Sequence, residues 1–204
     1  MRVGVYGGTF DPPHLGHLVA ASSAAQALRL DRVLWVPSAD HPFKGARVRT
    51  PAETRLELVR AAIEGDPRFA AEELELERPG PSYTVDTLRE LRTRLPGAEL
   101  FLLIGADNLA ELPAWRESEA LVRLARLAVV TRAGERVPED APYPALHVPV
   151  PRVDVSSTEV RRRAAAGECI RYLVPEPVRR LIEARGLYRG PSFQSETHQG
   201  RTPC

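Results

Sequence analysis

The chain has 204 residues, which fits one compact domain large enough to bury an apolar core. Its composition of 43% hydrophobic and 27% charged residues excludes collagen-like, coiled-coil and disordered classes. The formal net charge of +1 gives no overall basic footprint for nucleic acid. Lys44 is the only lysine among 28 Lys and Arg residues, so the basic residues are strongly biased towards arginine.

The two cysteines, Cys169 and Cys204, have neither the spacing of a disulfide framework nor that of a zinc site. We therefore expect a reducing, cytoplasmic environment. The sequence has no run of about 18 apolar residues and no charged segment followed by an apolar one at its start. We expect neither a membrane span nor a signal peptide.

The first part of the chain has the pattern of a βαβ unit. An apolar run over residues 3–6 ends in Gly7 and Gly8, which is typical of a buried strand that enters a glycine turn. A helix is predicted over residues 14–28, and residues 32–37 form a second β-rich run. This order of strand, helix and strand predicts a parallel sheet.

Further helices and strands alternate along the rest of the chain. The sequences TPAE at 50–53 and SSTE at 156–159 are typical of capping boxes and predict two helix starts. The alternation of Leu74 and Leu76 with glutamates predicts a half-exposed strand near the sheet edge. The other predicted elements are helices over about 51–63, 84–94, 157–166 and 175–185, and strands over 99–104, 127–131 and 146–150.

These elements predict a Rossmann-like α/β fold, which is an open parallel sheet flanked by helices, with a small C-terminal helical portion. We expect residues 1–189 to form a single domain and the polar residues 190–204 to form a disordered tail. Ligands of such sheets bind at the carboxyl ends of the strands. Three predicted strands lead there into the sequences GGTF, GAD and SST, so we expect these strand ends to meet at one cleft.

His14 and His17 stand three residues apart at the start of the first predicted helix, with Gly16 between them. This spacing puts both imidazoles on one face of the first turn, where the helix dipole favours an anion. Two imidazoles can donate hydrogen bonds to phosphate oxygens there. On the residues alone, two other interpretations stay open: a capping histidine beside a packed one, and a metal site with Asp11 as third ligand.

The sequence GGTFDPPHLGH at 7–17, together with SSTEVR at 156–161, resembles the nucleotidyltransferase superfamily that has the HxGH signature. Within that superfamily, GPSYT at 80–84, IGADNL at 104–109 and Trp115 are similar to nicotinate-nucleotide adenylyltransferases. The resemblance implies that nicotinate mononucleotide attacks the α-phosphate of ATP in line, which yields deamido-NAD and pyrophosphate. It implies that Mg²⁺ is carried with ATP and that the protein supplies no metal site of its own.

The resemblance also implies which residues bind ATP. His17 would contact the α-phosphate and His14 the triphosphate, and both would form the catalytic set with Arg161. The other implied ATP-binding positions, which supply backbone amides, hydroxyls or a carboxylate, are Gly8, Thr9, Phe10, Gly105, Asp107, Ser157 and Thr158.

A second group of residues matches the positions that bind the mononucleotide. Trp115 matches an aromatic residue that stacks on the pyridine ring. Ser82, Tyr83 and Thr84 match the segment whose backbone N–H groups receive the nicotinate carboxylate. An amide in place of that carboxylate would lose a charge-assisted hydrogen bond, so such a site can prefer the acid. Lys44 is in register with a substrate-binding lysine of the family, for which we expect a phosphate contact.

Other functions remain to be separated from this one. A related transferase acting on nicotinamide mononucleotide or phosphopantetheine should lack the GPSYT and Trp115 segments. An NAD-binding oxidoreductase should have the GxGxxG pattern, which is absent. A non-catalytic nucleotide sensor should have lost one of the two histidines. The partners implied are ATP and nicotinate mononucleotide, with no nucleic acid and no membrane, and a homo-oligomer is left open.

Overall fold

The computed structural model describes residues 1–39, 50–78, 80–132, 137 and 141–189. Within these residues, six parallel strands form one sheet in the order β3-β2-β1-β4-β5-β6. The strands are β1 (Arg2–Gly8), β2 (Arg32–Pro37), β3 (Phe69–Ala71), β4 (Glu99–Gly105), β5 (Arg126–Arg132) and β6 (Ala145–Val150). This strand order is that of doubly wound dinucleotide-binding folds, and it confirms the predicted Rossmann-like class.

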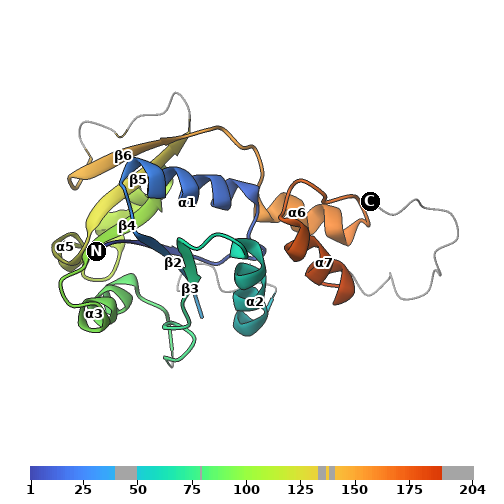
Figure 1. Ribbon diagram of the computed structural model, residues 1–204, viewed down its shortest axis with the longest axis horizontal. Coiled ribbons are helices and arrows are strands. Elements are labelled where there is room, and N and C mark those ends of the chain that lie inside the picture. Colours follow the sequence, from blue (N-terminus) through green and yellow to red (C-terminus); the bar gives the residue numbers. More distant parts are fainter. Residues whose placement is uncertain (40–49, 79, 133–136, 138–140, 190–204) are drawn as a thin grey trace, which may run out of the picture.

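Helices cover both faces of the sheet. Figure 1 shows α1 on one side of it, α3 and α5 on the other, and α6 beside α7. The helices are α1 (Leu15–Ala27), α2 (Ala52–Ile63), α3 (Thr84–Arg94), α4 (Ala106–Glu111), α5 (Ser118–Leu124), α6 (Ser157–Ala165) and α7 (Glu176–Ala184), and a short 3-10 helix, η2, covers Leu112–Ala114. No helix in the described part of the chain is long and apolar enough to cross a membrane.

Each face of the sheet has its own apolar core, because neighbouring residues of a strand point to opposite faces. In β4, Leu103 faces a core that is closed by α1, α2, α6 and α7. Its neighbour Leu102 faces a second core that is closed by α3, α4 and α5. Covering both faces explains why β4 is apolar almost throughout, in contrast to the alternating pattern of a half-exposed strand.

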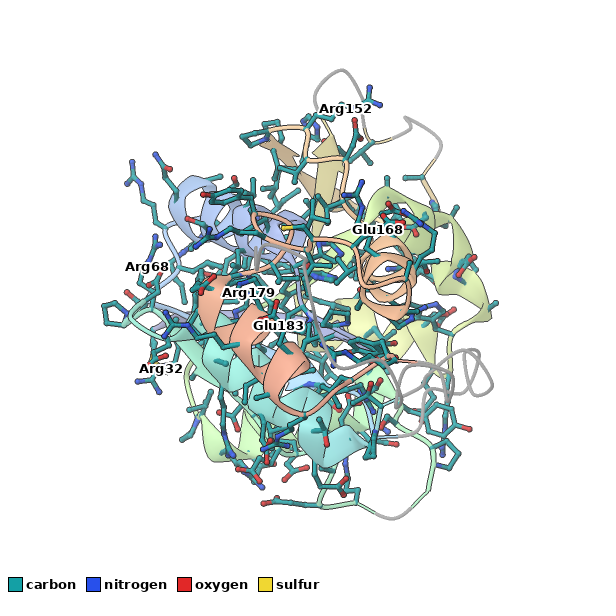
Figure 2. The ribbon with its side chains drawn as sticks, turned by 90° about the vertical axis from the view of Figure 1, so that its right-hand side faces the viewer. Arg32, Arg68, Arg152, Glu168, Arg179 and Glu183 are labelled. Carbon is teal, nitrogen blue, oxygen red and sulfur yellow. The ribbon has the colours of Figure 1, made fainter. Side chains whose placement is uncertain are left out.

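Helix α7 carries a largely buried arginine that is neutralised within the helix. Arg179 forms ion pairs with Glu176 at 2.7 Å and with Glu183 at 2.5 Å. Figure 2 shows Arg179 and Glu183 close together on α7, which packs against α2. The helix can therefore bury the arginine stem without leaving its charge unpaired.

The predicted strand around Leu74 is wrong. Residues 74–76 form a turn, and the edge strand is Phe69–Ala71, which pairs with β2. Leu74 packs into the second core, and the neighbouring Glu75 is buried too, at 7% exposure. The alternation of leucine with glutamate therefore reflects a buried turn and not a half-exposed strand.

The two predicted capping boxes have different outcomes. At α2 the N-cap residue is Pro51, without a side-chain bond, so the box predicted from Thr50 is wrong. At α6 the Ser156 hydroxyl accepts a hydrogen bond from the N–H of Glu159 at 3.2 Å, which is one half of the predicted box, while the Glu159 carboxylate accepts from Arg162 and Arg163. The other predicted helices and strands are present with closely similar ends, whereas α4, η2 and α5 were not predicted. The predicted tail, 190–204, lies outside the described residues.

Candidate active site

The candidate site is built on the loop that joins β1 to α1. The backbone of Phe10 adopts a positive φ of 50°, and its ring is buried at 2% exposure. The ring packs against Tyr6 and Trp35, with centroids 5.5 Å and 5.2 Å away. A Cβ atom on Gly8 would lie 2.8 Å from the Phe10 ring, so only glycine fits there without a shift. The buried ring therefore anchors this loop at the carboxyl end of β1.

The two histidines of the loop lie on one face of the first turn of α1, as predicted. Their ring centroids are 3.8 Å apart, and the backbone N–H of His14 donates to Nδ1 of His17 at 3.2 Å. A ring nitrogen that accepts a hydrogen bond carries no proton, so this bond selects the His17 tautomer that has its proton on Nε2. A Cβ atom on Gly16 would lie 3.1 Å from the His14 ring, which explains the glycine between them. His17 Nε2 is thereby prepared as a hydrogen-bond donor.

His14 is a buried, neutral side chain. It is 8% exposed, and burial lowers its pKa from 6.5 to about 4. Its Nδ1 atom, Thr9 Oγ1 and Ser38 Oγ are buried without a hydrogen-bond partner among the described residues. A buried polar atom without a partner is costly. Since Thr9 and Ser38 follow β1 and β2, such atoms at this edge suit a polar ligand.

The start of α6 reaches the same loop from a distant part of the sequence. Ser157 Oγ donates to the carbonyl of Pro12 at 2.9 Å, and Arg161 Nη1 donates to the carbonyl of Asp11 at 2.6 Å. Arg161 Nη2 also donates to Thr158 Oγ1 at 3.3 Å. The first N–H groups of α6 have no partner within the helix. The SSTEVR segment and the HxGH segment therefore meet, as the sequence predicted.

Asp11 connects this loop to the segment that follows α7. Its side chain is 2% exposed, and its Oδ1 accepts a hydrogen bond from the hydroxyl of Tyr188 at 2.9 Å. Its Oδ2 lies 4.0 Å from Arg161 Nη1. The buried carboxylate therefore holds both the guanidinium of α6 and the end of the C-terminal helical portion.

Gly105 and Asp107 lie at the neighbouring strand end. Gly105 ends β4, which is parallel to β1 and paired with it, so the two carboxyl ends lie at one edge of the sheet. Asp107 lies in the first turn of α4 and is exposed. Its carboxylate is therefore available at the edge that carries the two histidines.

The segment 82–84 is tied to the end of β2 and to a buried carboxyl group. Ser82 Oγ accepts a hydrogen bond from the N–H of Ala39 at 3.0 Å. Glu75 accepts a hydrogen bond from Thr87 Oγ1 at 2.8 Å and also bonds the Ser82 side chain. Burial raises the pKa of Glu75, and these hydroxyl groups counter that effect. The start of α3 is thus fixed relative to the strand ends.

Trp115 lies close to this segment. It follows η2 and is half-buried against the second core, as is Tyr83. The guanidinium of Arg116, the next residue, lies 4.6 Å from the centre of the Tyr83 ring. Tyr83 is the N-cap residue of α3, so the N–H of Thr84 begins a helix. The side chain of the residue after Trp115 therefore packs on the N-cap residue of α3.

Some sequence expectations have no structural outcome here, and some residues were not foreseen. Lys44 lies outside the described residues. No group of three or more His, Cys, Asp or Glu side chains that could hold a metal ion occurs among the residues described. Sequence reasoning missed Arg55, Glu75 and Tyr188. Only Arg55 had a local signal, because it lies on the apolar stripe of its helix.

Three kinds of similarity to known proteins accompany this geometry. The profile of the cytidylyltransferase-like family matches residues 5–163. A Thermus thermophilus protein described as a probable nicotinate-nucleotide adenylyltransferase is 51% identical over 93% of this chain and 100% of its own length. A protein from Exiguobacterium sibiricum with the same description is 48% identical over 92% of this chain and 99% of its own length. Structures of Plasmodium falciparum nicotinic acid mononucleotide adenylyltransferase with APC and with NaAD have a TM-score of 0.74. Both are 18% identical to this chain, and each match covers 92% of it. The matches span 96% and 97% of the two Plasmodium chains, and they support the fold.

The buried His14 ring predicts a pH dependence of stability. The His14 imidazole takes up a proton near pH 6.5 in the unfolded chain and only near pH 4 in the folded chain. Its contribution to the free energy of unfolding is therefore complete above pH 6.5 and decreases as the pH is lowered below that value. By pH 5 the free energy of unfolding should drop by about 2 kcal/mol through this group. The free energy of unfolding can be measured with urea at pH 7.5 and at pH 5. Its drop between the two pH values should be smaller in His14→Asn than in the wild-type protein by that amount. An equal drop in both proteins would contradict a buried, neutral His14.

Proposed function

We propose that this chain, which belongs to the cytidylyltransferase-like family as a nicotinate-nucleotide adenylyltransferase, joins ATP to nicotinate mononucleotide at the edge formed by the β1–α1 loop and α6. The observation that carries this proposal is the closely packed His14–His17 pair, with Ser157 and Arg161 bonded to the same loop. An oxygen of the mononucleotide phosphate attacks the α-phosphorus of ATP. The bond from that phosphorus to the β-phosphate oxygen breaks, and pyrophosphate leaves.

His17 is proposed to stabilise the charge that grows on the α-phosphate in the transition state. Its Nε2–H donates to a nonbridging oxygen, while the backbone N–H of His14 holds Nδ1 and fixes the tautomer. His14 is neutral and binds the triphosphate by hydrogen bonding and not by charge. No protein nucleophile is required, because positioning and charge stabilisation suffice for this transfer.

The triphosphate is proposed to lie between the two segments that the loop contacts. The backbone N–H groups of Gly8, Thr9 and Phe10 would bind it from one side. From the other side, Ser157, Thr158 and Arg161 would bind the β- and γ-phosphates at the start of α6, where the helix dipole favours an anion. These donors suit phosphate oxygens and not a cation, so we infer that Mg²⁺ enters with ATP and offsets the phosphate charge.

The two nucleosides are proposed to extend along the sheet edge in opposite directions. Gly105 would line the adenosine side, where the exposed carboxylate of Asp107 can accept hydrogen bonds from ribose hydroxyls. Trp115 would stack on the pyridine ring. The nicotinate carboxylate would be received by the backbone N–H groups of the segment Ser82, Tyr83 and Thr84, at the start of α3. Lys44 is retained as a phosphate-binding candidate on sequence grounds.

The substrate assignment is tested by pyrophosphate release with ATP and Mg²⁺. The acceptors compared are nicotinate mononucleotide, nicotinamide mononucleotide and phosphopantetheine. We expect the highest kcat/KM with the acid, because its carboxylate gains a charge-assisted hydrogen bond at the start of α3. No preference for the acid would reject this acceptor, and a preference for phosphopantetheine would favour the related transferase.

Replacing His17 tests the catalytic role. His17→Ala should lower kcat by about 10²–10³, which is typical of losing one preorganised transition-state contact. A matched control is His147→Ala on β6, since this histidine bonds Thr131 at 2.6 Å outside the proposed site. The control should keep its kcat, and near-normal kcat in His17→Ala would remove His17 from the role.

Replacing Trp115 tests the pyridine subsite. Trp115→Ala should raise KM for nicotinate mononucleotide by about fivefold and leave KM for ATP nearly unchanged, since one stacking contact is worth on the order of 1 kcal/mol. Tyr172→Ala is the control, because that aromatic residue is 76% exposed. Equal increases in both KM values for Trp115→Ala would argue against ring stacking.

A further inference from the structure

Arg55 is a buried arginine that has no part in the proposed chemistry. It lies near the start of α2, and its exposure is 1%. It occupies the helix face that also carries Leu58, Val59 and Ala62, all of them in the first core. Burying a guanidinium is costly unless its N–H groups are satisfied, so its hydrogen bonds need to be accounted for.

Among the described residues, Arg55 has four acceptors, which are backbone carbonyl oxygens from three separate segments. Nη1 donates to the carbonyl of Thr9 at 2.7 Å, after β1. Nη2 donates to the carbonyls of Ser38 at 2.6 Å and Ala39 at 3.1 Å, after β2. Nε donates to the carbonyl of Thr50 at 3.1 Å. All three nitrogen atoms of the planar guanidinium are used, so the ends of β1 and β2 are joined through one side chain.

These bonds fix the orientation of two peptide groups. In a trans peptide the C=O of one residue and the N–H of the next point in opposite directions. Holding the Thr9 carbonyl towards Arg55 therefore turns the Phe10 N–H away from it. The Ser38–Ala39 peptide is held on both sides, because its carbonyl accepts from Arg55 and its N–H donates to Ser82 Oγ.

The surroundings of Arg55 support a role in geometry and not in direct ligand contact. Burial lowers the pKa of its guanidinium, and the nearby charge of Asp11 has the opposite effect, followed by Tyr188, Glu53 and Glu75. Its donors are taken by the loop backbone, whereas Arg161 reaches the loop from α6 and is less buried.

We propose that Arg55 is a positioning residue that aligns the Thr9–Phe10 peptide for the phosphates of ATP and couples it to the segment 82–84 through the Ser38–Ala39 peptide. This inference rests on the proposed function, since the proposed function assigns the ATP phosphates to the β1–α1 loop. The planar fork is essential to it. A lysine ammonium is a point donor and cannot reach acceptors on three sides of a guanidinium.

The test compares Arg55→Lys and Arg55→Gln with a matched control, Arg179→Met. Arg179 is also buried and lies on a helix packed against α2, but its partners are carboxylates. The dissociation constant for ATP, measured by calorimetry without the mononucleotide, should rise about tenfold or more in both Arg55 variants, equivalent to about 1.4 kcal/mol. The control should bind ATP normally. Full recovery by Arg55→Lys, or unchanged binding in both variants, would overturn the proposal.

A second measurement covers the case in which the Arg55 variants do not fold. In the wild-type protein, the Nε–H proton of Arg55 should give a slowly exchanging NMR signal that moves little when ATP is added. A fast-exchanging signal, or a large shift on ATP addition, would overturn the positioning role. If the wild-type protein binds ATP but transfers nothing to nicotinate mononucleotide, the proposed function fails while the ATP-binding comparison at Arg55 still stands.

Discussion

The site depends on side chains that hold the carbonyl groups of the β1–α1 loop. The carbonyls of Thr9, Asp11 and Pro12 each accept a hydrogen bond from a side chain of another helix, namely Arg55, Arg161 and Ser157. A loop that binds phosphate needs its N–H groups free, so its carbonyls must be satisfied elsewhere. Here α2 and α6 satisfy them, and the buried ring of Phe10 fixes the turn between them. The helix packing and the proposed phosphate-binding surface are therefore parts of one arrangement.

A near-zero net charge is compatible with such a site because its cations are placed individually. Arg179 faces carboxylates and supports packing, Arg55 faces carbonyls and shapes the loop, and Arg161 bonds the loop from a less buried position. The field at a binding site depends on these local arrangements much more than on the total. In a chain this rich in arginine, the function of each one is set by the acceptors around it.

The sheet and most helices could be predicted because their signals are local. The apolar run of β4 and the capping sequence before α6 are examples, and the HxGH and SSTEVR segments pointed to two parts of the candidate site. The turn at Leu74 could not be distinguished from a strand, because a buried glutamate breaks the usual relation between charge and exposure. The contact between Asp11 and Tyr188 had no local signal, since 177 residues separate them. Long-range pairing of this kind is decided by tertiary packing.

The contacts between α6 and the β1–α1 loop also affect when the site can form during synthesis. The two residues of each contact are far apart in the sequence, by 145 positions for Ser157 and Pro12 and by 150 positions for Arg161 and Asp11. A chain that ends after β6 therefore has every strand of the sheet, but the carbonyls of Asp11 and Pro12 lack these donors. Chains fold from the N-terminus as they emerge, and contacts between distant residues form late. The β1–α1 loop is therefore completed only after the sheet it rests on. An incomplete chain would hold His14 and His17 on a formed scaffold yet lack the contacts from α6 that complete the proposed site.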